Sequence, residues 1–432
     1  LFGAGAAGGQ APVKREDFHV DTLLHGSPAG ALNRWFSGST PSAQFSYRDE
    51  DSWAELGAFI ITRHPCYPYV MCEIETARGC SRELTGGCAF CTEPFYGKPS
   101  HRSLEGIKDE ISALAKSGAA HFRIGRQPDI LTWQAGSGEF PVPRPEMIER
   151  LFSSIRACAP SLQTLHIDNV NPGTIARHPQ EAYEALDAIV RYHTPGDVAA
   201  FGMETADPAV IEENNLKATP EMMMDAIRIV QDAGGLRREG IPELLPGLNF
   251  IAGLAGETAR TYALNREFLE KVLQKGYLIR RVNIRQLMPF EGTRARDHNA
   301  LPVQERLFRD FKEWTRRHFD LPMLCKVFLG EGFKNVCFEI FLEPLGHGSH
   351  KTLFSMINHF FWQKCPYSFF ELILLPEPFQ LHLRWNGGTE LHKGVIKERN
   401  PYLKGMIHTH SISNCQDIFR QICFHIAIEH PV

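Results

Sequence analysis

The sequence reads Tyr69-Val-Met-Cys-Glu-Ile-Glu-Thr-Ala-Arg-Gly-Cys80-Ser-Arg-Glu-Leu-Thr-Gly-Gly-Cys88-Ala-Phe-Cys91 where a short apolar run passes into a loop with three cysteines. Three thiolates on one short loop suit an iron–sulfur cluster, because each holds one iron and a fourth iron remains without a protein ligand. An open metal position distinguishes a catalytic metal site from a closed structural one. Two adjacent glycines let the loop bend sharply, and Phe90 lies between the last two cysteines. The stretch therefore predicts a strand that ends in a metal-binding loop.

After this loop, apolar runs alternate with segments of helical periodicity. The predicted strands are Tyr69–Thr76, Ala119–Gly125, Leu162–Asp168, Asp197–Met203, Gly247–Gly253 and Arg281–Leu287. The predicted helices are Leu104–Lys116, Pro145–Ala157, Gln180–Tyr192, Pro220–Ala233, Ala259–Lys275 and Val303–His318. Successive strand–helix units predict a parallel α/β sheet, because parallel strands need a crossover connection. Six units are too few for the eight-stranded barrel, so we predict an incomplete (β/α)6 TIM-like barrel with its chemistry at the carboxyl ends of the strands.

This pattern divides the chain into three parts. Residues 1–60 are Gly/Ala-rich and then mixed, and we predict an irregular lead-in, the remnant of an upstream domain. Residues 61–320 hold the predicted barrel core. Residues 321–432 are rich in Phe and His, show no strand–helix unit, and form a C-terminal region whose fold the pattern does not indicate. The start at Leu1 rather than Met is compatible with a fragment of a longer protein.

The composition is that of an ordinary soluble globular protein, with 43% hydrophobic and 22% charged residues among 432. A formal net charge of −4 gives no electrostatic case for nucleic-acid binding by the chain as a whole. No stretch approaches the roughly 20 apolar residues that cross a bilayer, and no signal peptide is recognised. Eleven cysteines, an odd number, favour a reducing compartment. We therefore expect a cytoplasmic protein without a membrane partner.

From residue 67 to residue 318 the order of motifs resembles the radical S-adenosylmethionine (radical SAM) superfamily, close to a group of archaeal-type iron–sulfur oxidoreductases. The phrases that carry the resemblance are Glu-Thr-Ala-Arg-Gly-Cys80, Gly-Cys-Ala-Phe-Cys91-Thr-Glu-Pro, His-Phe-Arg-Ile-Gly-Arg-Gln127 and His166-Ile-Asp-Asn-Val-Asn-Pro172. The superfamily usually has three residues between the first two cysteines, whereas this sequence has seven. Members of the group commonly carry an extra N-terminal domain and a C-terminal helix-hairpin-helix, which we do not recognise in this sequence.

The resemblance implies that Cys80, Cys88 and Cys91 bind a [4Fe–4S] cluster whose open iron chelates SAM. One electron from the reduced cluster would cleave SAM to methionine and a 5′-deoxyadenosyl radical, which abstracts hydrogen from a substrate. An electron donor such as ferredoxin or flavodoxin is implied as well. Analogy with methylthiotransferase-type radical enzymes favours RNA or protein as the substrate. Those enzymes need a second cluster, for which the N-terminal part offers only Cys66 and Cys72.

The resemblance also assigns residues near the first two strands to SAM. Phe90 corresponds to the aromatic residue near the adenine, although it is also placed to pack the loop. Gly125, Arg126 and Gln127 take the place of the Gly-Gly-Glu segment that binds the methionine amino group. Arg126 has two further interpretations, a contact with the SAM or substrate carboxylate and a surface salt bridge.

Later strands contribute further candidates for the same cofactor. Glu204 follows the fourth strand at a position that is polar in relatives, and Lys217 would substitute for an arginine of the family. Asp168 would line the barrel mouth, or it caps the strand end. The adenine-side turn of the family would be formed by Gly253, Gly256 and Glu257. A carboxylate near a helix N-terminus is favourable in any case, so this turn also has a purely structural interpretation.

Two other interpretations of the chain remain open. In the first, the three cysteines bind zinc together with Cys72 or His101, and the protein is a non-catalytic, zinc-stabilised binding protein. In the second, the C-terminal region marks a decayed or chimeric product. The histidines and cysteines of that region fit no strong zinc-binding spacing.

Overall fold

A computed structural model describes most of the chain between residues 46 and 329. The chain divides into two compact units, Leu1–Asp320 and Leu321–Val432. Most of the predicted lead-in lies outside the described residues, as does most of the C-terminal region. The described parts are Ala31, residues 35–38, 46–238, 240–297 and 304–329, and the backbone of four strands between residues 371 and 406.

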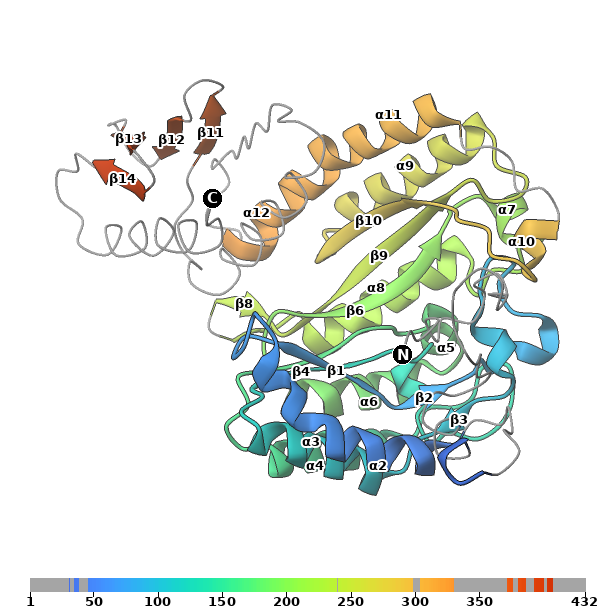
Figure 1. Ribbon diagram of the computed structural model, residues 1–432. Coiled ribbons are helices and arrows are strands. Elements are labelled where there is room, and N and C mark those ends of the chain that lie inside the picture. Colours follow the sequence, from blue (N-terminus) through green and yellow to red (C-terminus); the bar gives the residue numbers. More distant parts are fainter. Residues whose placement is uncertain are drawn as a thin grey trace. The chain divides into compact units, whose positions relative to one another are not determined.

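Six parallel strands form the centre of the first unit (Figure 1). One sheet has the order β1-β4-β5 and the other has the order β6-β9-β10. A parallel bridge between Asn169 and Ala200 links the end of β5 to β6. The bounds are β1 Met71–Glu75, β4 His121–Gly125, β5 Thr164–Ile167, β6 Asp197–Glu204, β9 Leu244–Ala252 and β10 Arg281–Gln286. The predicted α/β class with parallel strands is confirmed.

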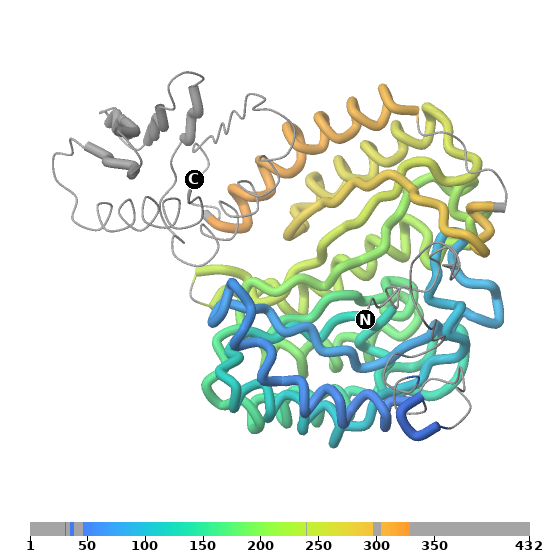
Figure 2. The backbone as a smooth tube through the Cα atoms, viewed as in Figure 1, coloured from blue at the N-terminus to red at the C-terminus, as the bar shows by residue number. Residues whose placement is uncertain are grey.

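Each of these strands is followed by a helix, so the chain winds in one direction from β1 to β10 (Figure 2). Ser103 and Thr219 cap two of the helices by accepting hydrogen bonds from Gly106 N and Met222 N. The larger helices are α3 Leu104–Lys116, α4 Pro145–Cys158, α6 Pro179–Tyr192, α8 Pro220–Gly234, α9 Ala259–Gln274 and α11 Glu305–Thr315. The helix predicted to continue to His318 instead becomes a π-helical turn over Arg316–Asp320.

Shorter elements complete the described chain. In the first unit they are α2 Tyr47–Gly57, β2 Ala77–Arg78, β3 Ser100–His101, α5 Pro172–Arg177, α7 Pro208–Glu213, β7 Arg237–Arg238, β8 Ile241–Pro242 and α10 Arg294–Asp297. The second unit contains α12 Leu321–Leu329 and an antiparallel sheet of β11 Glu371–Leu375, β12 Gln380–Trp385, β13 His392–Arg399 and β14 Tyr402–Met406. None of the described helices has the length and apolar character that membrane crossing requires.

The first sheet has one apolar and one charged face. Successive side chains of a strand point to opposite faces, and Cys72 and Ile74 of β1 are both buried. Glu73, which lies between them on β1, and Arg123 of β4 have side chains that are 32% and 38% exposed. Arg123 Nη2 lies 2.8 Å from Glu73 Oε1, so the two form an ion pair. Parallel strands usually bury apolar side chains on both faces. The charged face is therefore suited to polar ligands rather than to helix packing.

A buried histidine ties three elements together at the amino-terminal end of β6. His193 Nδ1 lies 2.9 Å from Asp197 Oδ2, and its Nε2 lies 3.3 Å from Glu243 Oε2. Arg238 Nε lies 2.7 Å from the other carboxylate oxygen of Glu243. Burial alone would lower the pKa of His193, but the hydrogen bonds and charges of the two acidic side chains outweigh burial and raise it. The imidazolium is therefore the form that this cluster stabilises.

We expect this cluster to make stability depend on pH. Because its folded pKa lies above the unfolded value of about 6.5, His193 contributes stability that is fully present below the unfolded pKa. That contribution is lost as pH rises through the folded pKa. His193→Gln should remove this pH dependence and cost about 3 kcal/mol at low pH, since it breaks a buried ion pair.

Urea unfolding of the full chain between about pH 5.5 and pH 8.5 measures both effects. His64→Gln, at an exposed position, is the matched control and should leave the pH slope unchanged. The account of His193 is wrong if His193→Gln unfolds with the pH slope of the unsubstituted chain.

Candidate cluster and SAM site

The three cysteines lie in one loop whose base is closed by the antiparallel pair β2–β3. Gly79 at this base has a φ of 95°, and a Cβ there would lie 2.6 Å from the Lys98 carbonyl oxygen. Only glycine fits such a position. The charged forms of Cys80, Cys88 and Cys91 interact electrostatically with one another. The three predicted cluster ligands thus lie in one loop, near enough for their charges to interact.

Each sulfur has a nitrogen donor beside it. Glu93 N donates to Cys91 Sγ at 3.4 Å, and a side-chain nitrogen of Arg82 donates to Cys88 Sγ at 3.3 Å. The backbone of Arg82 bonds to Cys80. Burial raises the pKa of all three thiols, that of Cys91 to about 12, so bound metal must displace their protons. Thiolates with N–H donors and nearby cations fit an iron–sulfur cluster.

The zinc interpretation needs Cys72 or His101 as a fourth ligand, and both residues have other neighbours in the structure. Cys72 is buried in β1, and its charged neighbour is Glu110 of α3. His101 Nδ1 accepts a hydrogen bond from Gln134 N at 3.2 Å. Within the part of the chain that the structure describes, no three His, Cys, Asp or Glu side chains are grouped to hold a single metal ion.

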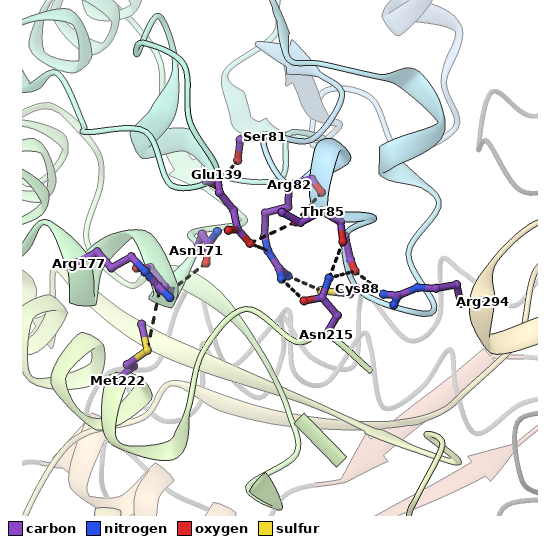
Figure 3. Close-up of polar contacts among 12 residues, drawn as sticks. Ser81, Arg82, Thr85, Cys88, Glu139, Asn171, Arg177, Asn215, Met222 and Arg294 are labelled. Carbon is purple, nitrogen blue, oxygen red and sulfur yellow. Dashed lines mark hydrogen bonds and ion pairs between the residues drawn. The ribbon is translucent and has the colours of Figure 1, made fainter. Parts of the chain in front are cut away.

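Distant segments hold the backbone of the cysteine loop in place. Asn215 Nδ2 donates to Thr85 O and Gly87 O at 2.9 and 2.8 Å (Figure 3). Arg294 Nη2 donates to Gly87 O at 2.7 Å. Ala89 N donates to Asn214 O at 2.9 Å. The shape of the loop therefore depends on residues more than a hundred positions away in the sequence.

Glu204 and Lys217 meet at the carboxyl end of β6. Glu204 Oε1 lies 3.9 Å from Lys217 Nζ, and their side chains are 7% and 22% exposed. A Cβ on Gly202 would lie 2.2 Å from Glu204 Oε1 and 2.4 Å from Lys217 Nζ, so this glycine makes room for the pair. Burial raises the pKa of Glu204 to about 7, and Lys217 and Arg285 oppose that rise.

Two observations indicate that Glu204 and Lys217 belong to a functional site. Glu204 has a φ of 60°, which costs a non-glycine residue of the order of 1–3 kcal/mol and is frequent at functional sites. Lys217 also interacts electrostatically with Cys80, Cys88 and Cys91. The fold therefore places the predicted Glu204 and Lys217 beside the cysteine loop.

The segment after β4 presents an unpaired buried acceptor at Gln127. Gln127 is 2% exposed, and its Nε2 donates to Ile124 O at 3.0 Å. Its Oε1 has no hydrogen-bond partner among the described residues. A buried acceptor without a donor is costly. Gln127 is therefore prepared for a ligand that donates an N–H or O–H group.

Gly125 and Arg126 are placed differently from Gln127. A Cβ on Gly125 would lie 2.4 Å from Glu73 Oε1, so the carboxylate of Glu73 occupies the space beside this glycine. Arg126 has a φ of 61°, is 53% exposed, and places its Nε 3.7 Å from Glu75 Oε2. It forms the surface ion pair that was one of its alternatives.

The turn after β9 is closed by its own carboxylate. Glu257 Oε2 accepts a hydrogen bond from Gly253 N at 2.7 Å, and its Oε1 accepts one from the Tyr262 hydroxyl. Gly253 and Gly256 have φ values of 99° and 80°. Both glycines are needed by the backbone, and the carboxylate of Glu257 is occupied by the turn itself.

The described neighbours of Phe90 are apolar, and those of Asp168 are charged. Phe90 packs against an apolar cluster formed by Val210, Leu216 and Leu254. Burial raises the pKa of Asp168, whereas Arg123 and Arg281 lower it. Asp168 therefore belongs to the charged face of the sheets.

Four residues at the site have no counterpart among the predicted ones. Arg82, Glu139 and Asn215 surround the cysteine loop. Asp129 caps the short helix Ile130–Thr132, is 6% exposed, and has a pKa that burial raises to about 6. Arg82 lies between the ligand cysteines Cys80 and Cys88 in the sequence, and this position could have identified it as a residue of the site. The other three come from segments whose proximity no local pattern reveals.

The chain was compared with known proteins. An uncharacterised protein of Methanocaldococcus jannaschii is 43% identical over 319 residues, which are 71% of this chain and 59% of that protein. This chain thus spans about three fifths of the length of that relative. A tRNA-2-methylthio-N(6)-dimethylallyladenosine synthase of Desulfotalea psychrophila is 23% identical over 191 residues, 44% of this chain and 39% of that protein.

Among solved structures, coproporphyrinogen III oxidase from Escherichia coli, a radical SAM enzyme, has a TM-score of 0.39 at 14% identity, covering 63% of this chain and 55% of that chain. The family model of the radical SAM superfamily matches residues 74–268, which include the cysteine loop. Enzymes of this family use a [4Fe–4S] cluster and SAM, so the cofactors predicted from the cysteine loop are those of the family. Within residues 74–268, this chain is therefore similar to the radical SAM superfamily.

Proposed function

We propose that this chain is a radical SAM enzyme in which Cys80, Cys88 and Cys91 bind the cluster. The observation that carries the proposal is that three thiols of one clamped loop lie beside the ion pair of Glu204 and Lys217. In this proposal the six strands form an incomplete (β/α)6 barrel. The cysteine loop and the Glu204–Lys217 pair both lie at the carboxyl ends of the strands, where such folds place their chemistry.

The residues of the chain would bind and orient SAM. When bound, the cluster supplies the electron for reductive cleavage of SAM, and the reaction removes hydrogen from a substrate. The unpaired Oε1 of Gln127 suits the ammonium group of the methionine part, since that group brings N–H donors. Glu204 and Lys217 offer opposite charges to the polar groups of the same cofactor.

The charged face of the sheets supports a polar substrate. Glu73 and Arg123 lie on this face, together with Asp168 and Arg281, whose charges interact. We propose a macromolecular substrate, RNA or protein, by analogy with the relative that is named as a tRNA methylthio synthase. A cytoplasmic location and an electron donor such as ferredoxin or flavodoxin belong to the same proposal.

Loss of one ligand cysteine tests the proposal most simply. After anaerobic reconstitution, the unsubstituted chain should be brown, with absorbance near roughly 400 nm, and should release 5′-deoxyadenosine from SAM under a strong reductant. Cys88→Ala should bind little iron and release none. Cys66→Ala removes an exposed cysteine outside the loop and should match the unsubstituted chain. A colourless, zinc-loaded protein, or product release by Cys88→Ala, would contradict the assignment.

SAM binding should follow the ionisation of Glu204. Its pKa of about 7 results from burial, opposed by Lys217 and Arg285. Only about one tenth of such carboxyl groups are ionised one pH unit below the pKa. We therefore expect the cluster-loaded protein to bind SAM roughly tenfold more weakly at about pH 6 than at about pH 8.

Calorimetric titration with SAM across this pH range measures the effect. Glu204→Gln keeps the size of the side chain, so it should bind SAM more weakly at high pH and lose the pH dependence. Glu184→Gln, an exposed carboxylate on α6, should retain both. An unchanged pH dependence in Glu204→Gln would exclude this residue as the titrating group.

A further inference from the structure

Arg82 is a buried guanidinium inside the cysteine loop. The residue is 4% exposed, and its side chain donates hydrogen bonds in three directions (Figure 3). Nε donates to Glu139 Oε1 at 3.0 Å, Nη1 donates to Cys88 Sγ at 3.3 Å, and Nη2 donates to Asn215 Oδ1 at 3.0 Å. One rigid fork therefore joins a ligand sulfur to two segments outside the loop.

The partners of Arg82 are themselves held by the loop. Glu139 Oε1 also accepts a hydrogen bond from the Thr85 hydroxyl at 3.2 Å, and Ser81 Oγ donates to Glu139 O at 2.8 Å. Asn215 donates to the carbonyl oxygens of Thr85 and Gly87. Since every contact returns to the same loop, the guanidinium has little freedom to turn away from Cys88.

The charge of Arg82 acts directly on Cys88. Nη1 of its guanidinium donates to Cys88 Sγ at 3.3 Å, so a positive charge lies against this ligand sulfur. Glu139 balances part of the guanidinium charge but is 39% exposed, so solvent screens it. Arg82 therefore places both a hydrogen-bond donor and a positive charge at this ligand sulfur.

A cluster gains one negative charge when it is reduced. An N–H donor and a fixed cation at a ligand sulfur stabilise that extra charge and raise the reduction potential. We propose that Arg82 is a positioning residue that fixes Cys88 and raises the reduction potential of the cluster bound by Cys80, Cys88 and Cys91. The inference rests on the proposed function for the presence of the cluster.

Geometry explains why arginine stands at this position. A guanidinium presents five donors in a planar fork, whereas the lysine ammonium is a compact point charge on a flexible stem. Lysine at position 82 would keep the cation but would not bond Glu139, Cys88 and Asn215 together. Substitution of Arg82 by lysine or by an uncharged residue can therefore separate the effect of its charge from the effect of its positioning of Cys88.

The test is a redox titration of the full chain after anaerobic reconstitution, followed by electron paramagnetic resonance, with iron content measured in parallel. Arg82→Met keeps an unbranched side chain like the apolar stem of arginine and removes the charge and the donors. It should lower the equilibrium constant for reduction about tenfold, which is about 59 mV for one electron. Arg82→Lys should shift the potential in the same direction by less.

Two further variants complete the experiment. Asn215→Ala leaves the guanidinium in place but removes one of its anchors, and should also lower the potential. Arg144→Met is the matched control, because Arg144 is 50% exposed and pairs with Glu146; its potential should equal that of the unsubstituted chain.

The outcomes distinguish this inference from the proposed function. Full iron content with an unchanged potential in Arg82→Met would overturn the role of Arg82 and leave the proposed function intact. If Arg82→Met takes up no iron, unchanged potentials in both Arg82→Lys and Asn215→Ala would overturn it. An unsubstituted chain that forms no iron–sulfur cluster would overturn the proposed function itself.

Discussion

Side-chain hydrogen bonds to the backbone of the cysteine loop keep three sulfurs together. The loop has little regular structure, so few of its carbonyl groups are paired within a helix or sheet. Asn215 and Arg294 supply donors to two of those carbonyls, and Asn214 accepts from the loop at Ala89. The spacing of the cysteines in the sequence does not by itself fix the positions of the sulfurs, and these contacts supply the missing constraint.

Charge is the second constraint on this region. Burial disfavours ionisation of the three thiols and of Glu204, yet a thiolate cluster requires the thiols to be ionised. Lys217, Arg82 and Arg285 are cations that act on these groups. Bound metal would complete the compensation. Arg82 therefore both joins the loop to Glu139 and Asn215 and places positive charge beside a ligand sulfur.

The sequence predicts the strands and helices well because their patterns are local. The helix Leu104–Lys116 begins and ends as expected, since Ser103 caps it and its apolar residues recur with helical spacing. The strand ending at Gly125 is confirmed for the same reason. The chain after Thr315 was harder, because a π-helical turn over Arg316–Asp320 has no local signature.

The site was predictable only where its residues share a motif. The cysteines and Lys217 come together as expected, whereas Arg126 pairs with Glu75 and Glu257 closes its own turn. The contact of Asn215 with Arg82 joins positions 133 residues apart, and no spacing rule reveals it. Polar contacts of this kind depend on the completed fold rather than on any local pattern.

The central claim is that three cysteine sulfurs bind a cluster and leave one iron for SAM. Mössbauer spectroscopy of the chain reconstituted with ⁵⁷Fe, before and after addition of SAM, tests it directly. The account predicts a four-iron cluster in which one iron changes its isomer shift when SAM binds, because only that iron lacks a cysteine ligand. Four irons that remain indistinguishable with SAM, or a protein without clustered iron, would contradict it.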